Sequence, residues 1–117
     1  MKGKKMSRCV ALEYAIPGCC DGGAYVVTVS TIKELIESIR HCAGLDDGNE
    51  YPAGADPEEY SPDMESAFMD MARESARYLW NKRGAGDYIT LPWRNGFIIR
   101  MERMTASEAQ EMRQNEY

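Results

Sequence analysis

The sequence predicts a small two-layer α+β domain, in which two β-hairpins form one antiparallel sheet and the helices lie on one face. Two pairs of apolar, β-branched segments are each interrupted by glycine-containing turns, which is typical of hairpins. Apolar residues at helical spacing lie between the pairs, and a weaker helical pattern follows them. The element order is therefore ββααββα, and residues 1–117 are sufficient for a single domain. We expect residues 1–6 to be a loose tail and residues 113–117 to fray.

The first hairpin is predicted from alternation of apolar residues. From Arg8 to Ile16 one face of the chain carries only apolar or aromatic side chains, namely Val10, Leu12, Tyr14 and Ile16. Two turn signals follow, Pro17-Gly18 and Asp21-Gly22-Gly23. Residues 24–30 (AYVVTVS) then have the composition of a second strand, so a hairpin is the simplest connection.

Local end signals define the helices. Thr31 and Glu34 have the spacing of a capping box, and Gly44 is placed to end the first helix after a stripe of Ile32, Leu35, Ile36 and Ile39. Ser61 before Pro62 predicts the start of a second helix that runs to about Lys82. Its apolar stripe is predicted to be Met64, Phe68, Met71, Ala72, Ser75 and Leu79. Thr105 and Glu108 predict a capping box for a short third helix.

The second hairpin surrounds Asn95-Gly96 in residues 87–103 (DYITLPWRNGFIIRMER). A three-residue loop, with Gly96 at positive φ, places six apolar residues on one face. The predicted pairs are Trp93 with Phe97, Leu91 with Ile99, and Ile89 with Met101.

Charge is distributed unevenly along the chain. The net charge is −5, but nine acidic residues and no lysine or arginine lie between residues 44 and 72. Residues 44–60 lack periodicity and are rich in glycine, proline and acids, which predicts an acidic loop. We expect six of its acids to form a surface that binds a basic partner protein: Asp46, Asp47, Glu50, Asp56, Glu58 and Glu59.

The sequence contains no recognisable catalytic motif, such as a dinucleotide fingerprint or a phosphate-binding loop. His41 could act as a base, but no serine or carboxylate motif accompanies it, so a structural role is expected. Cys9, Cys19, Cys20 and Cys42 are expected to be reduced thiols without metal, because their spacing and that of His41 fit no zinc site. We therefore expect a protein that is not an enzyme and needs no cofactor.

The favoured function is that of a small acidic protein-binding module. In size and charge the chain resembles phage and mobile-element accessory proteins that inhibit nucleic-acid-handling machinery, although no motif supports this resemblance. One alternative is weak nucleic-acid binding by the basic and aromatic strip 73–103, through Arg77, Lys82, Arg83 and Arg94. Another is a small enzyme whose carboxylates meet only in the folded chain. No apolar run reaches the roughly 20 residues of a membrane span and no export signal is evident, so a cytoplasmic protein without membrane contact is expected.

Overall fold

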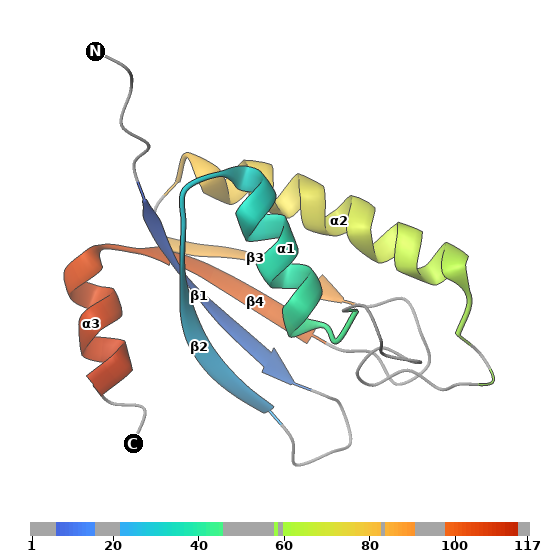
Figure 1. Ribbon diagram of the computed structural model, residues 1–117, viewed down its shortest axis with the longest axis horizontal. Coiled ribbons are helices and arrows are strands. Elements are labelled where there is room, and N and C mark those ends of the chain that lie inside the picture. The colour runs from blue at the N-terminus through green and yellow to red at the C-terminus, as the bar shows by residue number, and fades with distance from the viewer. Residues whose placement is uncertain are drawn as a thin grey trace.

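The chain folds into a four-stranded antiparallel sheet with three helices in the part that the computed structural model describes (Figure 1). That part comprises residues 7–15, 22–45, 58, 60–82, 84–90 and 98–114. The elements in chain order are β1 (Arg8–Ala15), β2 (Gly22–Val29), α1 (Ile32–Cys42), α2 (Pro62–Trp80), β3 (Gly84–Thr90), β4 (Ile98–Met104) and α3 (Ala106–Gln114). The predicted α+β class and the order ββααββα are confirmed.

The two hairpins join into one sheet through their first and last strands. The strand order is β2-β1-β4-β3, so β1 and β4 are central and β2 and β3 form the edges. All eight residues of β1 pair with β2 in an unbroken register, from Arg8 opposite Val29 to Ala15 opposite Gly22. The local patterns did not predict this order. As a result of it, no described strand pairs with the outer edge of β2.

The core lies between the sheet and the helices α1 and α2, which cover the same face (Figure 1). The apolar face predicted for β1 is confirmed in Val10 and Leu12, which are fully buried, but Ala11 on the other face is buried as well, so the strand is not half-buried along its whole length. The stripe predicted for α1 is also confirmed in Leu35 and Ile39, which are fully buried. In α2 the buried side chains are Phe68, Ala72, Ser75, Ala76 and Leu79.

Met71 is a correction to the predicted stripe of α2. Its side chain is 36% exposed, whereas Ala76, which was not assigned to the stripe, is fully buried. At 100° per residue Met71 falls at the margin of the arc that holds Phe68, Ala72 and Leu79, and Ala76 falls nearer to its centre.

Capping and glycine signals set the ends of α1. The Thr31 side chain accepts a hydrogen bond from the Glu34 amide at 3.1 Å, and the Glu34 carboxylate accepts one from the Thr31 amide at 3.2 Å. Gly44, with φ of 75°, follows the helix as predicted, because its backbone conformation is one that other residues rarely adopt. The box of Thr105 and Glu108 is present as well.

The start of α2 differs in one detail from the prediction. Pro62 occupies the first turn as expected, but the Ser61 side chain makes no capping hydrogen bond, so its predicted capping role is wrong. The proline already removes one of the amides that would need a partner, and Ser61 contributes its carbonyl, which accepts from the Met64 amide at 3.1 Å.

The predicted register of the second hairpin is wrong, although the three described residues of the predicted apolar face are buried as expected. Ile89 pairs with Ile99, which excludes the expected pairing of Ile89 with Met101 and of Leu91 with Ile99. Ile89, Ile99 and Met101 are nevertheless all buried on the core side. A slip of two residues preserves the face of every side chain, so the apolar pattern could not choose between these registers. The predicted Trp93–Phe97 pair and the conformation of Gly96 lie outside the described residues.

The third helix lies apart from α1 and α2. It packs against β1, β2 and β4, and its buried Ala109 is separate from the main core. Cys9 and Thr28, which alternate with core residues, line a cavity of about 450 Å³ together with Ala106 and Gln110 of α3. The predicted placement of helices on one face therefore holds for α1 and α2, while α3 covers part of the other face.

Candidate functional site

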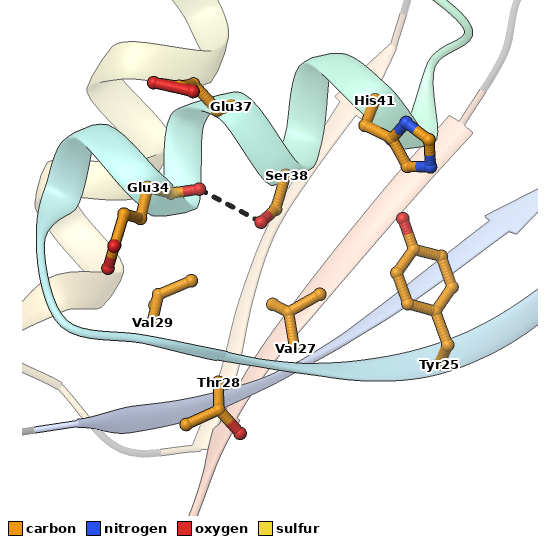
Figure 2. Close-up of a pocket in the computed structure, with 8 residues that line it drawn as sticks. All are labelled: Tyr25, Val27, Thr28, Val29, Glu34, Glu37, Ser38 and His41. Atoms are coloured by element: carbon orange, nitrogen blue, oxygen red, sulfur yellow. Dashed lines mark hydrogen bonds between the residues drawn. The ribbon is translucent and has the colours of Figure 1, made fainter.

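A cavity of about 370 Å³ opens between α1 and the edge strand β2 (Figure 2). Its volume is at the lower end of the roughly 300–1,000 Å³ typical of ligand sites. The residues that line it come from these two elements alone: Tyr25, Val27, Thr28 and Val29 from β2, and Glu34, Glu37, Ser38 and His41 from α1.

The short connection between the two elements creates this cavity. Strand β2 ends at Val29 and α1 begins at Ile32, so the helix turns back and runs along the strand it has just left. Residues three, four and seven apart lie on one side of a helix, which brings Glu34, Ser38 and His41 to the side that faces the strand. In Figure 2 these side chains lie above Val29, Val27 and Tyr25 respectively.

The polar groups of the cavity are partly engaged by the helix itself. The Ser38 hydroxyl donates to the Glu34 carbonyl at 3.0 Å. The Glu34 carboxylate accepts from the Ser30 amide at 2.6 Å, in addition to its capping bond. A nucleophilic serine would instead donate to its base, so the geometry of Ser38 does not favour covalent catalysis.

Glu37, Tyr25 and His41 give the cavity its remaining polar character. Glu37 also lines the cavity and is exposed, and Figure 2 shows its carboxylate at the outer rim, on the side of α1 away from β2. Figure 2 shows the Tyr25 hydroxyl directed toward the exposed His41 ring. Carboxylate, hydroxyl and imidazole groups beside valine side chains can bind a partly polar, partly apolar chain.

Cys42 lies next to this site and is half-buried. Burial raises the pKa of its thiol, and a side-chain hydrogen bond with Tyr25 lowers that pKa by a smaller amount. Because the thiolate is the reactive form, the raised pKa makes Cys42 a poor nucleophile near neutral pH. Within the described ranges no three His, Cys, Asp or Glu residues are grouped as metal ligands. Cys19 and Cys20 lie outside those ranges.

The structure describes only part of the binding surface predicted from charge. Glu58 is exposed, while Asp46, Asp47, Glu50, Asp56 and Glu59 lie outside the described residues. Of the alternative basic strip, Arg77 and Lys82 are exposed, and the Lys82 ammonium lies 4.7 Å from the centre of the Tyr78 ring. Arg83 and Arg94 are also outside the described residues.

Both ends of the acidic stretch are fixed to the body of the domain. Leu45 is buried in the core, and Tyr60 packs against it. The Tyr60 hydroxyl donates to the Glu65 carboxylate at 2.6 Å, and that carboxylate lies 3.7 Å from the Arg40 guanidinium. Arg40 belongs to α1 and Glu65 to α2, so this cluster ties the two helices to the end of the acidic stretch.

The cluster predicts a loss of stability at alkaline pH. Burial, together with the hydrogen bond and negative charge of Glu65, raises the pKa of Tyr60 to about 12, and Arg40 opposes this shift. The pKa in the unfolded chain is about 10, so the stabilisation is complete below about pH 10 and disappears as the pH rises toward 12. Denaturant unfolding of the natural protein and of Tyr60→Phe should therefore give a difference in free energy that shrinks over this range. A difference that stays constant would contradict the prediction.

Sequence reasoning identified His41 as a candidate but missed the groove around it. The spacing of Glu34, Ser38 and His41, combined with the two residues between strand and helix, was the available signal. Nothing local indicated that β2 is an edge strand, because that depends on the pairing of β1 with β4.

Comparison of the chain with protein-family models, curated proteins and solved structures found no match. Among the described residues, no helix combines the length and the apolar character that crossing a membrane requires. The class of protein that the fold defines is thus a small α+β domain with a groove beside an edge strand.

Proposed function

We propose that this protein is a small acidic protein-binding module that docks on a basic surface of a partner protein. The observation that carries the proposal is the charge of the groove between α1 and β2. Its lining contains two glutamates and no lysine or arginine, in a chain whose net charge is −5. Proteins that handle nucleic acids carry basic surfaces, so they are the expected class of partner, and occupation of such a surface would inhibit them.

The acidic stretch 44–60 strengthens the attraction. Asp46 and Asp47 directly follow the buried Leu45 in the sequence, and Leu45 is three residues after the end of α1. Charges of one sign accelerate the encounter with a partner of opposite sign, while nearby complementary groups fix the bound position. In this proposal the acids of residues 44–60 accelerate the encounter, and Glu37 together with the cavity fixes the bound position.

Binding is a better interpretation than catalysis for the same groups. The Ser38 hydroxyl donates to a helix carbonyl, and the pKa of the Cys42 thiol is raised. Glu34 is held by the helix start. The hydrogen bonds of Glu34 stabilise the start of α1, and Glu37 is the other exposed carboxylate that α1 contributes to the lining.

The proposal is tested by selecting binders from a displayed library of random peptides somewhat longer than the eight residues of β2. We expect enrichment of lysine and arginine. Affinity should fall steeply between about 0.1 M and 1 M salt, over which the screening length shortens from about 10 Å to about 3 Å. Two neutralised variants should bind these peptides at least about tenfold more weakly, a change of roughly 1.4 kcal/mol. One variant changes Asp46, Asp47 and Glu50 to the corresponding amides, and the other changes Asp56, Glu58 and Glu59 in the same way.

A matched control removes the same number of charges elsewhere. It neutralises three exposed acids outside the groove, namely Asp70, Glu74 and Glu111. Equal losses in all three variants would show that only net charge matters and would contradict a localised surface. Selection of acidic or uncharged peptides would overturn the proposal. So would tight binding of a single-stranded oligonucleotide that is lost in Arg77→Gln with Lys82→Gln, because it would move the function to the basic strip.

A further inference from the structure

The edge strand β2 lacks the features that normally protect an edge. Edge strands usually carry charged residues, proline or a bulge that prevents another strand from pairing with them. The sequence of β2, GGAYVVTV, has no charge and no proline, and its pairing with β1 is unbroken over eight residues. The other edge, β3, contains Asp87, and its pairing with β4 shifts between Ala85 and Tyr88. The two edges therefore differ, and among the described strands β2 is the edge whose sequence and pairing lack these protective features.

The cavity lies on the outer side of this open edge. No residue of β1, the inner neighbour of β2, lines it. Thr28 also lines it, although Figure 2 shows its side chain on the opposite face of β2 from Val27 and Val29. A strand added here would direct every second side chain toward α1 and into the cavity. Figure 2 shows that space between Val27 and Val29 below and Ser38 and Glu34 above.

Charge identifies the chemistry of the occupant. Glu37 at the rim is exposed, and the lining residues include no lysine or arginine to compete for it. The Tyr25 ring is part of the same wall, and aromatic rings attract ammonium and guanidinium groups. A second copy of this chain would bring the same acidic residues to the groove, whereas a lysine- or arginine-containing segment would complement them.

We propose that β2 accepts an extended, basic segment of the partner protein as a fifth strand, whose alternate side chains enter the cavity beside α1. This rests on the proposed function, because it specifies the form in which the partner is bound. In this mode the hydrogen bonds of the main chain hold the segment, and the cavity selects its side chains. The sheet would then have five strands, in the order added strand-β2-β1-β4-β3.

The first test uses the selected basic peptide with the highest affinity, synthesised with a methyl group on one backbone amide at a time. A strand directs successive amides to opposite sides, so methylation at alternate positions should weaken binding about tenfold or more, while the positions between should change it little. Uniform tolerance, or sensitivity with helical spacing, would overturn strand addition. In that outcome the proposed function would stand if binding remained salt-sensitive. If the selection gave no basic peptide, both the proposed function and strand addition would be contradicted.

The second test needs no substitution in the protein and so avoids folding defects. Amide hydrogen exchange is measured residue by residue with and without the unmethylated peptide. Alternate amides of β2 should become protected, while those of β3 serve as the internal control and should not change. Protection confined to β3 or to α2 would overturn the proposal. Protection of β2 that increases with protein concentration in the absence of peptide would overturn it in favour of a second copy.

Discussion

Replacement of Phe68 by alanine is expected to destabilise the domain by about 3–5 kcal/mol. Phe68 lies in the middle of α2 and is the largest of the fully buried side chains. It belongs to the cluster that contacts both the sheet and α1, so truncation removes apolar contacts and leaves a cavity that the surrounding elements cannot fill completely. A domain of this size is stable by only about 5–15 kcal/mol, so the variant should be close to unfolding at physiological temperature.

Denaturant titration with a matched control measures this effect. Met71→Ala is on the same helix, but its side chain is 36% exposed, so we expect a change within about 0.5 kcal/mol. Similar losses in both variants would indicate that burial does not determine the result, since alanine has the higher helix propensity in both substitutions. A loss below about 1 kcal/mol for Phe68→Ala would mean that the core is not packed as described.

The second large effect is expected at the end of α2. The guanidinium groups of Arg8 and Arg103 both donate hydrogen bonds to the carbonyl of Trp80, the last residue of the helix. Arg8 also lies over the Trp80 ring, with 4.0 Å between its guanidinium carbon and the ring centre. Positive charge at a helix C-terminus is stabilising, and hydrogen bonds from charged donors are the stronger kind.

Arg103→Met keeps most of the side-chain volume and removes the charge and its hydrogen bonds. We expect a loss of about 1.5–3 kcal/mol, measured by the same denaturant titration. Arg73→Met is the control, because Arg73 forms an exposed ion pair with Asp70 at 3.1 Å that should contribute at most about 0.5 kcal/mol. If both substitutions cost the same, the contact of Arg103 with the end of α2 has no special role.

Local signals in the sequence predicted those parts of the fold that local chemistry determines. Thr31, Glu34 and Gly44 act within a few residues of one another, so the ends of α1 could be predicted without knowledge of the rest of the fold. The register of β3 and β4 was not predictable in the same way, because Ile89, Ile99 and Met101 face the core in either register. Arg103 was not anticipated at all, since its partner carbonyl is 23 residues away in the chain.

The candidate site was only partly predictable for a similar reason. His41 was singled out as an isolated residue, but the groove exists because α1 turns back over β2 and places Tyr25 and Ser38 beside it. The open edge depends on the strand order, which requires the pairing of two strands from opposite ends of the chain. Charge, in contrast, is visible in the sequence, and the acidic character expected of the binding surface is shared by the groove lining.

The central claim, that the partner binds in the groove between α1 and β2, is tested most directly by two single substitutions. Glu37→Gln and Glu74→Gln each neutralise one exposed helical glutamate, but only Glu37 lines the groove. The affinity of the selected basic peptide is measured for both variants by calorimetric titration. We expect Glu37→Gln to weaken binding about two- to fivefold and Glu74→Gln by less than about 1.5-fold, since only Glu37 lines the groove and an exposed charge pair contributes at most about 1 kcal/mol. Equal effects of the two substitutions, or the larger effect at Glu74, would contradict the claim.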